Sequence, residues 1–274
     1  MNIFVKRWGI GGLLLLAACV MLFAGWRHFA PRLPHFPYLS GWLLFALMLL
    51  LTFYNGRKKI PFLPAGRSEG WLLIHIYVGF LTVALFAIHA GLRTPNGWFE
   101  GTLAWLYLLV TASGIVGLGI SRVFPERLTT RGGEVLFENI PTIRRALRER
   151  AETLALDALP AAKSATVTEF YLAELQDFFA GPRNFFSHLL EFRNPLNRLL
   201  HRINETNRYL NADERKLLDQ LAALVRQKDG LDYHFALQLA LKLWLFVHIP
   251  LTYSLLIFSV VHIVLVFAYA GGTP

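Results

Sequence analysis

Two long apolar stretches, each carrying two histidines fourteen residues apart, constrain this chain more than any other feature. The stretches are residues 71–91 and residues 243–270, and the histidines are His75, His89, His248 and His262. Each stretch is long and apolar enough to cross a bilayer as a helix. Fourteen residues make nearly four helical turns, a rise of about 21 Å that returns both rings to nearly the same face. The sequence therefore predicts two membrane helices that each place one imidazole near either side of the membrane.

The composition indicates an integral membrane protein that also has a polar part. Of the 274 residues, 55% are hydrophobic, whereas soluble domains are about 45–50% apolar. Residues 8–26, 39–54 and 102–120 are three further candidate spans. We therefore expect an all-α membrane protein in which about five transmembrane helices form a bundle.

A polar segment separates the fourth span from the fifth. Residues 123–232 hold 16 Lys+Arg and 16 Asp+Glu, so the net charge of +9 lies outside this segment. Four helix-periodic stretches, cut by proline and glycine, predict amphipathic helices at residues 142–159, 164–180, 195–210 and 212–228. We expect transmembrane helices one to four over residues 1–122, a soluble helical insert over residues 123–232, and a final transmembrane helix over residues 233–274.

The cations around the spans predict the topology. Those that precede span one, separate spans two and three or follow span four are Lys6, Arg7, Arg57, Lys58, Lys59, Arg67, Arg122, Arg127 and Arg131. The opposite loops hold only Arg27, Arg32 and Arg93. By the positive-inside rule, the N-terminus and the insert are cytoplasmic and the C-terminus lies outside, in a bacterial-type inner (plasma) membrane. Spans three and five then run parallel, which brings the four histidines to two matching depths.

The single cysteine, Cys19, excludes several kinds of redox centre. It rules out an intramolecular disulfide, a thiolate-held iron–sulfur cluster and a C-x-x-C-H covalent haem site within this chain. Cys19 ends a box similar to a lipoprotein cleavage site, but the apolar run continues beyond it, so an uncleaved membrane anchor is expected. The polar segment has no basic stripe with interleaved aromatics, so no nucleic-acid partner is expected.

Histidines inside a bilayer are costly and usually functional. A zinc site needs ligands that converge on one point, whereas the two depths lie about 21 Å apart along the helix. A proton relay would normally include carboxylates within the spans, and neither histidine-bearing stretch contains one. Two histidine pairs at two depths can instead hold two haems, each with one histidine from either helix. The alternative is a cofactor-free structural subunit whose histidines are buried in polar networks.

This pattern resembles the di-haem b-type cytochromes, the membrane cytochrome b subunits of quinone-linked respiratory complexes. In that family two helices of a bundle each give two histidines at a similar spacing. The resemblance covers spans three to five and implies that His75 and His248 hold a cytoplasmic-side haem b, while His89 and His262 hold an outer-side haem b. The large insert is not typical of the family, and no Pro-Glu-Trp-Tyr-like quinol-site motif is present.

The resemblance also implies a function and partners. Bis-histidine iron has no open position for a substrate, so the expected function is transmembrane electron transfer as a subunit of a quinone-linked oxidoreductase. The expected partners are membrane lipid, quinone or quinol, and other redox subunits or cytochromes of a complex. A ferric-reductase or NADPH-oxidase-like membrane core is the alternative with the same ligand pattern. It needs a flavin-binding reductase, and the insert has no dinucleotide-binding glycine-rich turn.

Several glycines and the remaining histidines of the insert complete the expectations. In span four, Gly114, Gly117 and Gly119 can admit another helix or a flat macrocycle. Near the histidines of span three, Gly79 and Gly91 indicate either room for a porphyrin or ordinary helix packing. The histidines within and beside the insert are expected at the surface, and these are His188, His201 and His234.

Overall fold

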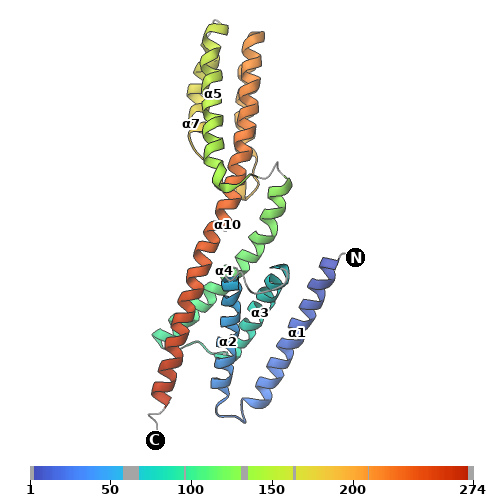
Figure 1. Cartoon of the computed structure of the whole chain (residues 1–274), viewed down its shortest axis with the longest axis vertical. Helices are drawn as coiled ribbons and strands as arrows, with labels where there is room; N and C mark the ends of the chain where they lie inside the picture. The colour runs from blue at the N-terminus through green and yellow to red at the C-terminus, as the bar shows by residue number, and fades with distance from the viewer. Residues whose placement is uncertain are drawn as a thin grey trace. The chain divides into compact units, whose positions relative to one another are not determined.

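The structure is a computed structural model that describes residues 3–57, 68–95, 97–130, 135–162, 165–208 and 210–270 (Figure 1). Throughout these residues the regular structure is helical, with no strand. Five helices are long and apolar enough to cross a membrane, and these are α1 (Ile3–Phe29), α2 (Phe36–Arg57), α3 (Ser68–His89), α4 (Trp98–Thr130) and α10 (Ala212–Ala270). The all-α fold class and the five candidate spans are thereby confirmed.

The chain divides into two compact units. The membrane unit comprises residues 1–118 and 244–274, and the polar unit comprises residues 119–243. The sequence analysis put the borders at residues 122 and 232, but α4 and α10 continue through both positions. Four cations used for the topology, Lys58, Lys59, Arg67 and Arg131, lie outside the described residues.

A glycine ends α3 directly after its second histidine. Gly91 has a φ of +62°, in the left-handed region that glycine adopts at no steric cost. Its N–H donates to the Ile88 carbonyl at 3.0 Å, and the N–H of Leu92 donates to the Ala87 carbonyl at 3.0 Å. These two bonds form a Schellman motif. Gly91 therefore stops the helix directly after His89, as expected for a third span that ends near Gly91.

Helix α10 is longer than the sequence indicated. We expected a separate amphipathic helix over residues 212–228 and a new helix from about residue 233, but the structure has one continuous helix of 59 residues. Gly230 does not break it, because a single glycine in a helix costs only about 1 kcal/mol relative to alanine. Pro250 also lies inside the helix. One helix thus carries side chains of the polar unit and both histidines of the last span.

The polar unit is built from α10 and a set of shorter helices. These are α5 (Ile140–Ala162), α6 (Thr166–Phe170), η2 (a π-helix, Tyr171–Leu175), α7 (Gln176–Ala180), α8 (Phe185–Leu189) and α9 (Asn194–Asn207), with a 3-10 turn, η1 (Phe137–Asn139), before α5. Their apolar faces enclose a core that includes Val167, Leu175, Phe179, Leu218 and Val225, each fully buried. Helix α8 was not expected from the sequence.

Two charged residues of α10 are buried within the polar unit. Lys228 is 0% exposed, and its ammonium donates to Asp232 and, at 2.7 Å, to the Gly181 carbonyl. Asp232 is 1% exposed, accepts the backbone N–H of Arg183 at 3.0 Å and lies 3.5 Å from the guanidinium of Arg144. Burial lowers the pKa of Lys228, although the Asp232 carboxylate opposes this shift. Through Gly181 and Arg183, the pair holds the loop after α7 against α10.

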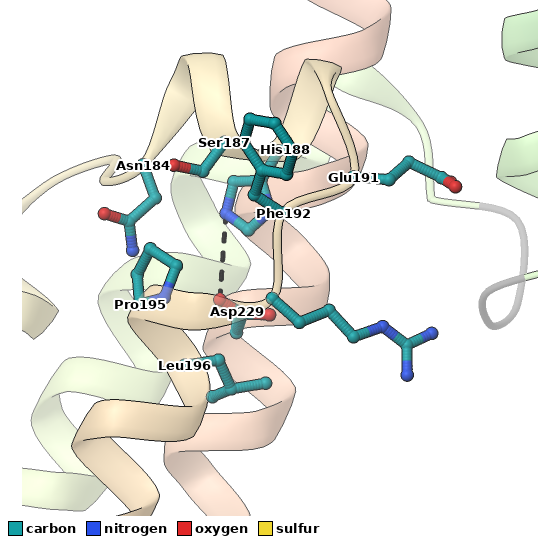
Figure 2. Close-up of a pocket in the computed structure, with 9 residues that line it drawn as sticks. Asn184, Ser187, His188, Glu191, Phe192, Pro195, Leu196 and Asp229 are labelled. Carbon is teal, nitrogen blue, oxygen red and sulfur yellow. Dashed lines mark ion pairs between the residues drawn. The ribbon is translucent and has the colours of Figure 1, made fainter.

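The histidines of the polar unit correct one expectation. His201 is exposed as expected, but His188 is 6% exposed and His234 is 4% exposed. Nε2 of His188 lies 3.7 Å from Oδ1 of Asp229, as Figure 2 shows. Polar sequence neighbours suggested a surface position for these rings, but both lie where α10 is covered by other elements of the unit.

We expect Asp232→Asn to destabilise the protein, because it leaves the Lys228 ammonium buried without a counter-charge. Breaking a buried ion pair from one side typically costs about 3–5 kcal/mol. The measurement is the thermal unfolding midpoint of the full chain in detergent. Asp219→Asn is the matched control, since Asp219 is exposed on the same helix. Equal midpoints for the two variants would contradict the structural role of the pair.

Candidate functional site: two histidine pairs

His89 of α3 and His262 of α10 face each other within the membrane unit. Their ring centres lie 6.4 Å apart and their planes are perpendicular, at 90°. Both rings line a cleft of about 330 Å³ that α2, α3, α4 and α10 enclose with mainly apolar side chains. A cleft of this size, apolar with few polar groups, is typical of a ligand or cofactor site.

The separation of the two rings fits a shared metal ion. Two imidazoles that bind one ion from opposite sides hold their nitrogens about 4 Å apart, because each metal–nitrogen bond is about 2 Å. Each ring centre lies about 1 Å beyond its nitrogen, which puts the centres about 6 Å apart. The observed 6.4 Å matches this value. Among the described residues, His, Cys, Asp and Glu do not gather in groups of three or more, so two histidines make up each candidate site.

A serine from α2 fixes the orientation of His89. The Ser40 hydroxyl is buried, donates to the Pro37 carbonyl at 3.0 Å and lies 3.1 Å from Nδ1 of His89. When the single hydrogen of the hydroxyl is donated to Pro37, Nδ1 of His89 carries the hydrogen of the second bond and donates it to Ser40. This tautomer leaves the lone pair of Nε2 available to a metal.

The same arrangement recurs at His248 of α10. Nδ1 of His248 lies 3.2 Å from the hydroxyl of Ser113 on α4. In both places a glycine follows the serine and lies against the ring. A Cβ at Gly41 would lie 2.9 Å from Cε1 of His89, and a Cβ at Gly114 would lie 3.7 Å from Cε1 of His248. A Ser-Gly pair on a neighbouring helix thus holds one histidine of each pair.

The other histidine of each pair lies against an aromatic ring. His262 stacks on Phe99 with ring centres 6.5 Å apart, and His75 lies 5.1 Å from the ring of Tyr54. His75 is also within electrostatic range of His248. Nδ1 of His75 is buried and makes no hydrogen bond with the residues that the structure describes. The structure therefore brings His89 and His262 together across α3 and α10, and it puts His75 and His248, on the same two helices, within electrostatic range of each other.

Trp244 completes the surroundings of His248. Its indole N–H donates to the Ser113 carbonyl at 2.8 Å, and its ring stacks on His248 with centres 5.5 Å apart. The ring lies directly against Gly117, where a Cβ would come within 1.9 Å of the indole. Of the glycines expected to admit a close neighbour in α4, Gly117 admits this indole, whereas Gly119 has nothing within 4 Å.

A packed apolar layer separates the two pairs. Phe86 of α3 stacks on Tyr107 of α4 with ring centres 4.1 Å apart, and the Tyr107 hydroxyl donates to the Thr82 hydroxyl at 3.1 Å. Leu85 and Leu255, which lie between the histidines on their own helices, belong to the same buried cluster. The two candidate sites are therefore separate, with a closed layer of side chains between them.

Sequence reasoning missed Ser40, Ser113, Tyr54 and Phe99. The dipeptide Ser-Gly occurs in two apolar spans, at residues 40–41 and 113–114, and this repetition was the available signal. No protein-family model matches the chain, and neither a characterised protein nor a solved structure is detectably similar to it.

We expect Gly117→Ala to lower the thermal unfolding midpoint, because its Cβ cannot fit beside the indole of Trp244 and α4 must move away. Overpacking of this kind typically costs about 1–3 kcal/mol. Gly119→Ala is the matched control, because a Cβ there meets nothing. A Gly117→Ala protein as stable as the control would contradict the close contact between Gly117 and Trp244.

Proposed function

We propose that this chain is a di-haem b-type membrane cytochrome that carries electrons across the bilayer between the quinone pool and a redox partner. His89 with His262 would hold one haem b, and His75 with His248 would hold the other. The single observation that carries the proposal is the His89–His262 pair, with ring centres 6.4 Å apart and both rings lining an apolar cleft. The five apolar helices support contact with membrane lipid.

The protein's own residues supply orientation and a dry environment. The Ser40 and Ser113 hydroxyls are hydrogen-bonded to Nδ1 of His89 and Nδ1 of His248, and when Nδ1 is the donor the lone pair of Nε2 is available to iron. The Phe86–Tyr107 layer packs the space between the pairs and keeps water out of it. When bound, a bis-histidine haem supplies one-electron transfer without an open position for substrate.

The topology belongs to the proposal as well. Arg122 and Arg127 follow the apolar part of α4, which favours the cytoplasmic side for the polar unit. We place the chain in a bacterial-type inner membrane, with the His75–His248 pair toward the cytoplasm. The polar unit would then dock a cytoplasmic redox subunit, and quinone or quinol would exchange electrons from within the bilayer.

The purified protein should show the reduced-minus-oxidised absorbance bands of b-type haem, at two haems per chain. His89→Ala should remove one haem and retain the other, because the two sites share no side chain. His201→Ala is the control, since His201 is exposed in the polar unit and paired only with its helix neighbour Glu205. A colourless protein would leave a cofactor-free structural subunit as the function. Equal loss of both haems from His89→Ala would contradict separate sites.

Ser40→Ala should weaken retention of one haem and raise its midpoint potential. The hydrogen bond that Nδ1–H donates makes the imidazole a stronger donor, which stabilises the oxidised iron, and losing such a bond typically lowers metal affinity about 10–100-fold. The checks are haem content and a redox titration.

Ser259→Ala is the matched control for Ser40→Ala. Ser259 lines the same cleft, but its hydroxyl donates to the Leu255 carbonyl of its own helix. A Ser40→Ala protein with the potentials and haem content of the control would show that Ser40 does not position His89.

A further inference from the structure

The segment containing α8 in the polar unit has two apolar faces, of which only one is covered. On the covered face, Phe185 and Leu189 pack against Phe124, Tyr233, Leu237 and their neighbours. On the other face of α8, Phe186 is 75% exposed and Leu190 is 63% exposed, and just beyond the helix Phe192 is 59% exposed beside the pocket that His188 and Asp229 line. A short segment that is apolar on both faces needs a second apolar environment.

Contacts with α4 and α10 fix the orientation of the segment, so that its exposed face stays exposed. The Arg127 guanidinium donates to the Leu189 carbonyl at 3.2 Å and pairs with Glu191 at 3.6 Å. The Tyr233 hydroxyl donates to the same Glu191 carboxylate at 3.0 Å. In Figure 2, His188 points toward Asp229 on the inner side, while Glu191 points away from this pair. The segment is thus fixed to α4 and α10, and it cannot turn Phe186, Leu190 and Phe192 inward.

The covered face packs on residues of α4 and α10 that follow or precede the apolar stretches of these helices in the chain. Its cluster includes Ile120, the last residue of the apolar stretch of α4, and Leu241, just before the apolar stretch of α10. Phe124 lies one turn beyond Ile120, about 6 Å along the helix. The polar headgroup layer on each side of a bilayer is itself about 5–8 Å thick. The segment therefore belongs at the depth of the headgroups.

The charges around the exposed face favour an anionic surface. Arg183 and Arg193 flank the segment and are both exposed, and the Arg183 guanidinium also pairs with the exposed Asp177 carboxylate at 3.7 Å. The one carboxylate within it, Glu191, is already paired with Arg127 and Tyr233. Aromatic and aliphatic side chains interleaved with arginine are typical of segments that lie in the membrane interface, and each nearby cation is attracted to anionic lipid.

We propose that residues 183–193 form a membrane-docking segment, in which Phe186, Leu190 and Phe192 insert into the headgroup layer of anionic lipid while Arg183 and Arg193 contact the phosphates. The polar unit would thereby rest on the membrane surface through a second contact, besides the spans themselves. This proposal does not depend on haem and can be tested on protein that contains none.

The test places an environment-sensitive fluorophore on a single cysteine in the full chain. In a Cys19→Ser background, Phe186→Cys or Leu190→Cys is labelled and reconstituted into vesicles of phosphatidylcholine and phosphatidylglycerol. In the vesicles, both labels should emit at a shorter wavelength than the same fluorophore attached to a short peptide in buffer without detergent. Both labels should also be quenched by brominated acyl chains. Replacing Arg193 with Glu should reduce that quenching, because the segment then loses attraction to phosphatidylglycerol.

Leu156→Cys is the matched control. Leu156 is also an exposed leucine of the polar unit, at 61%. It lies on α5 about 24 Å from Ile140, where that helix begins beside α10, and its label should stay in water and respond to iodide instead. Phe186 and Leu190 labels that behave like the Leu156 label in these vesicles would overturn the proposal. Such a result would show that the exposed face is not in lipid and would leave a protein partner as its occupant.

Discussion

The membrane unit depends on how an imidazole is satisfied inside hydrocarbon. Moving a ring nitrogen from water into an apolar medium without a hydrogen bond or a metal costs roughly several kcal/mol of free energy. Ser40 and Ser113 satisfy Nδ1 of His89 and His248 from neighbouring helices. Gly41 lets α2 come close enough to His89 to do so, since a Cβ there would lie 2.9 Å from the ring, whereas a Cβ at Gly114 would be in ordinary contact at 3.7 Å. The packing of the helices therefore also sets the orientation of these two imidazole rings, since neither serine can reach its ring unless both helices are in place.

The polar unit solves the same problem for charged groups. Lys228 and Asp232 are removed from water together, and Arg144, Gly181 and Arg183 supply the remaining partners. Both residues lie on α10, the helix that also carries His248 and His262. In the polar unit this helix is held by the buried Lys228–Asp232 pair, and in the membrane unit it is held by the hydrogen bond between His248 and Ser113.

Much of the membrane unit could be predicted because it depends on single helices. Span length, hydropathy and the fourteen-residue spacing are local properties, and they led to the all-α fold and to the expectation that His89 and His262 lie together, as their rings do. The contacts of Ser40 and Tyr54 depend on how each helix is rotated against its neighbour, which periodicity alone does not fix. The continuity of α10 was missed because the change from polar to apolar composition near residue 233 was taken as the start of a new helix, whereas the structure has one helix through it. His188 and His234 were misplaced because burial within the polar unit comes from tertiary packing, not from polar sequence neighbours.

The layer between the two histidine pairs has an electrical consequence. Residues 76–88 and 249–261, which separate the histidines on their helices, contain no acidic or basic side chain. Tyr107 ends its hydrogen bond on Thr82, whose own hydroxyl hydrogen goes to the Gly79 carbonyl at 2.7 Å. Tyr107 is also hydrogen-bonded to Thr111 of its own helix, so each of these partners is an uncharged group. If each histidine pair holds a haem as proposed, an electron that moves between them crosses a layer whose described side chains carry no charge, and its transfer charges the bilayer as current charges a capacitor.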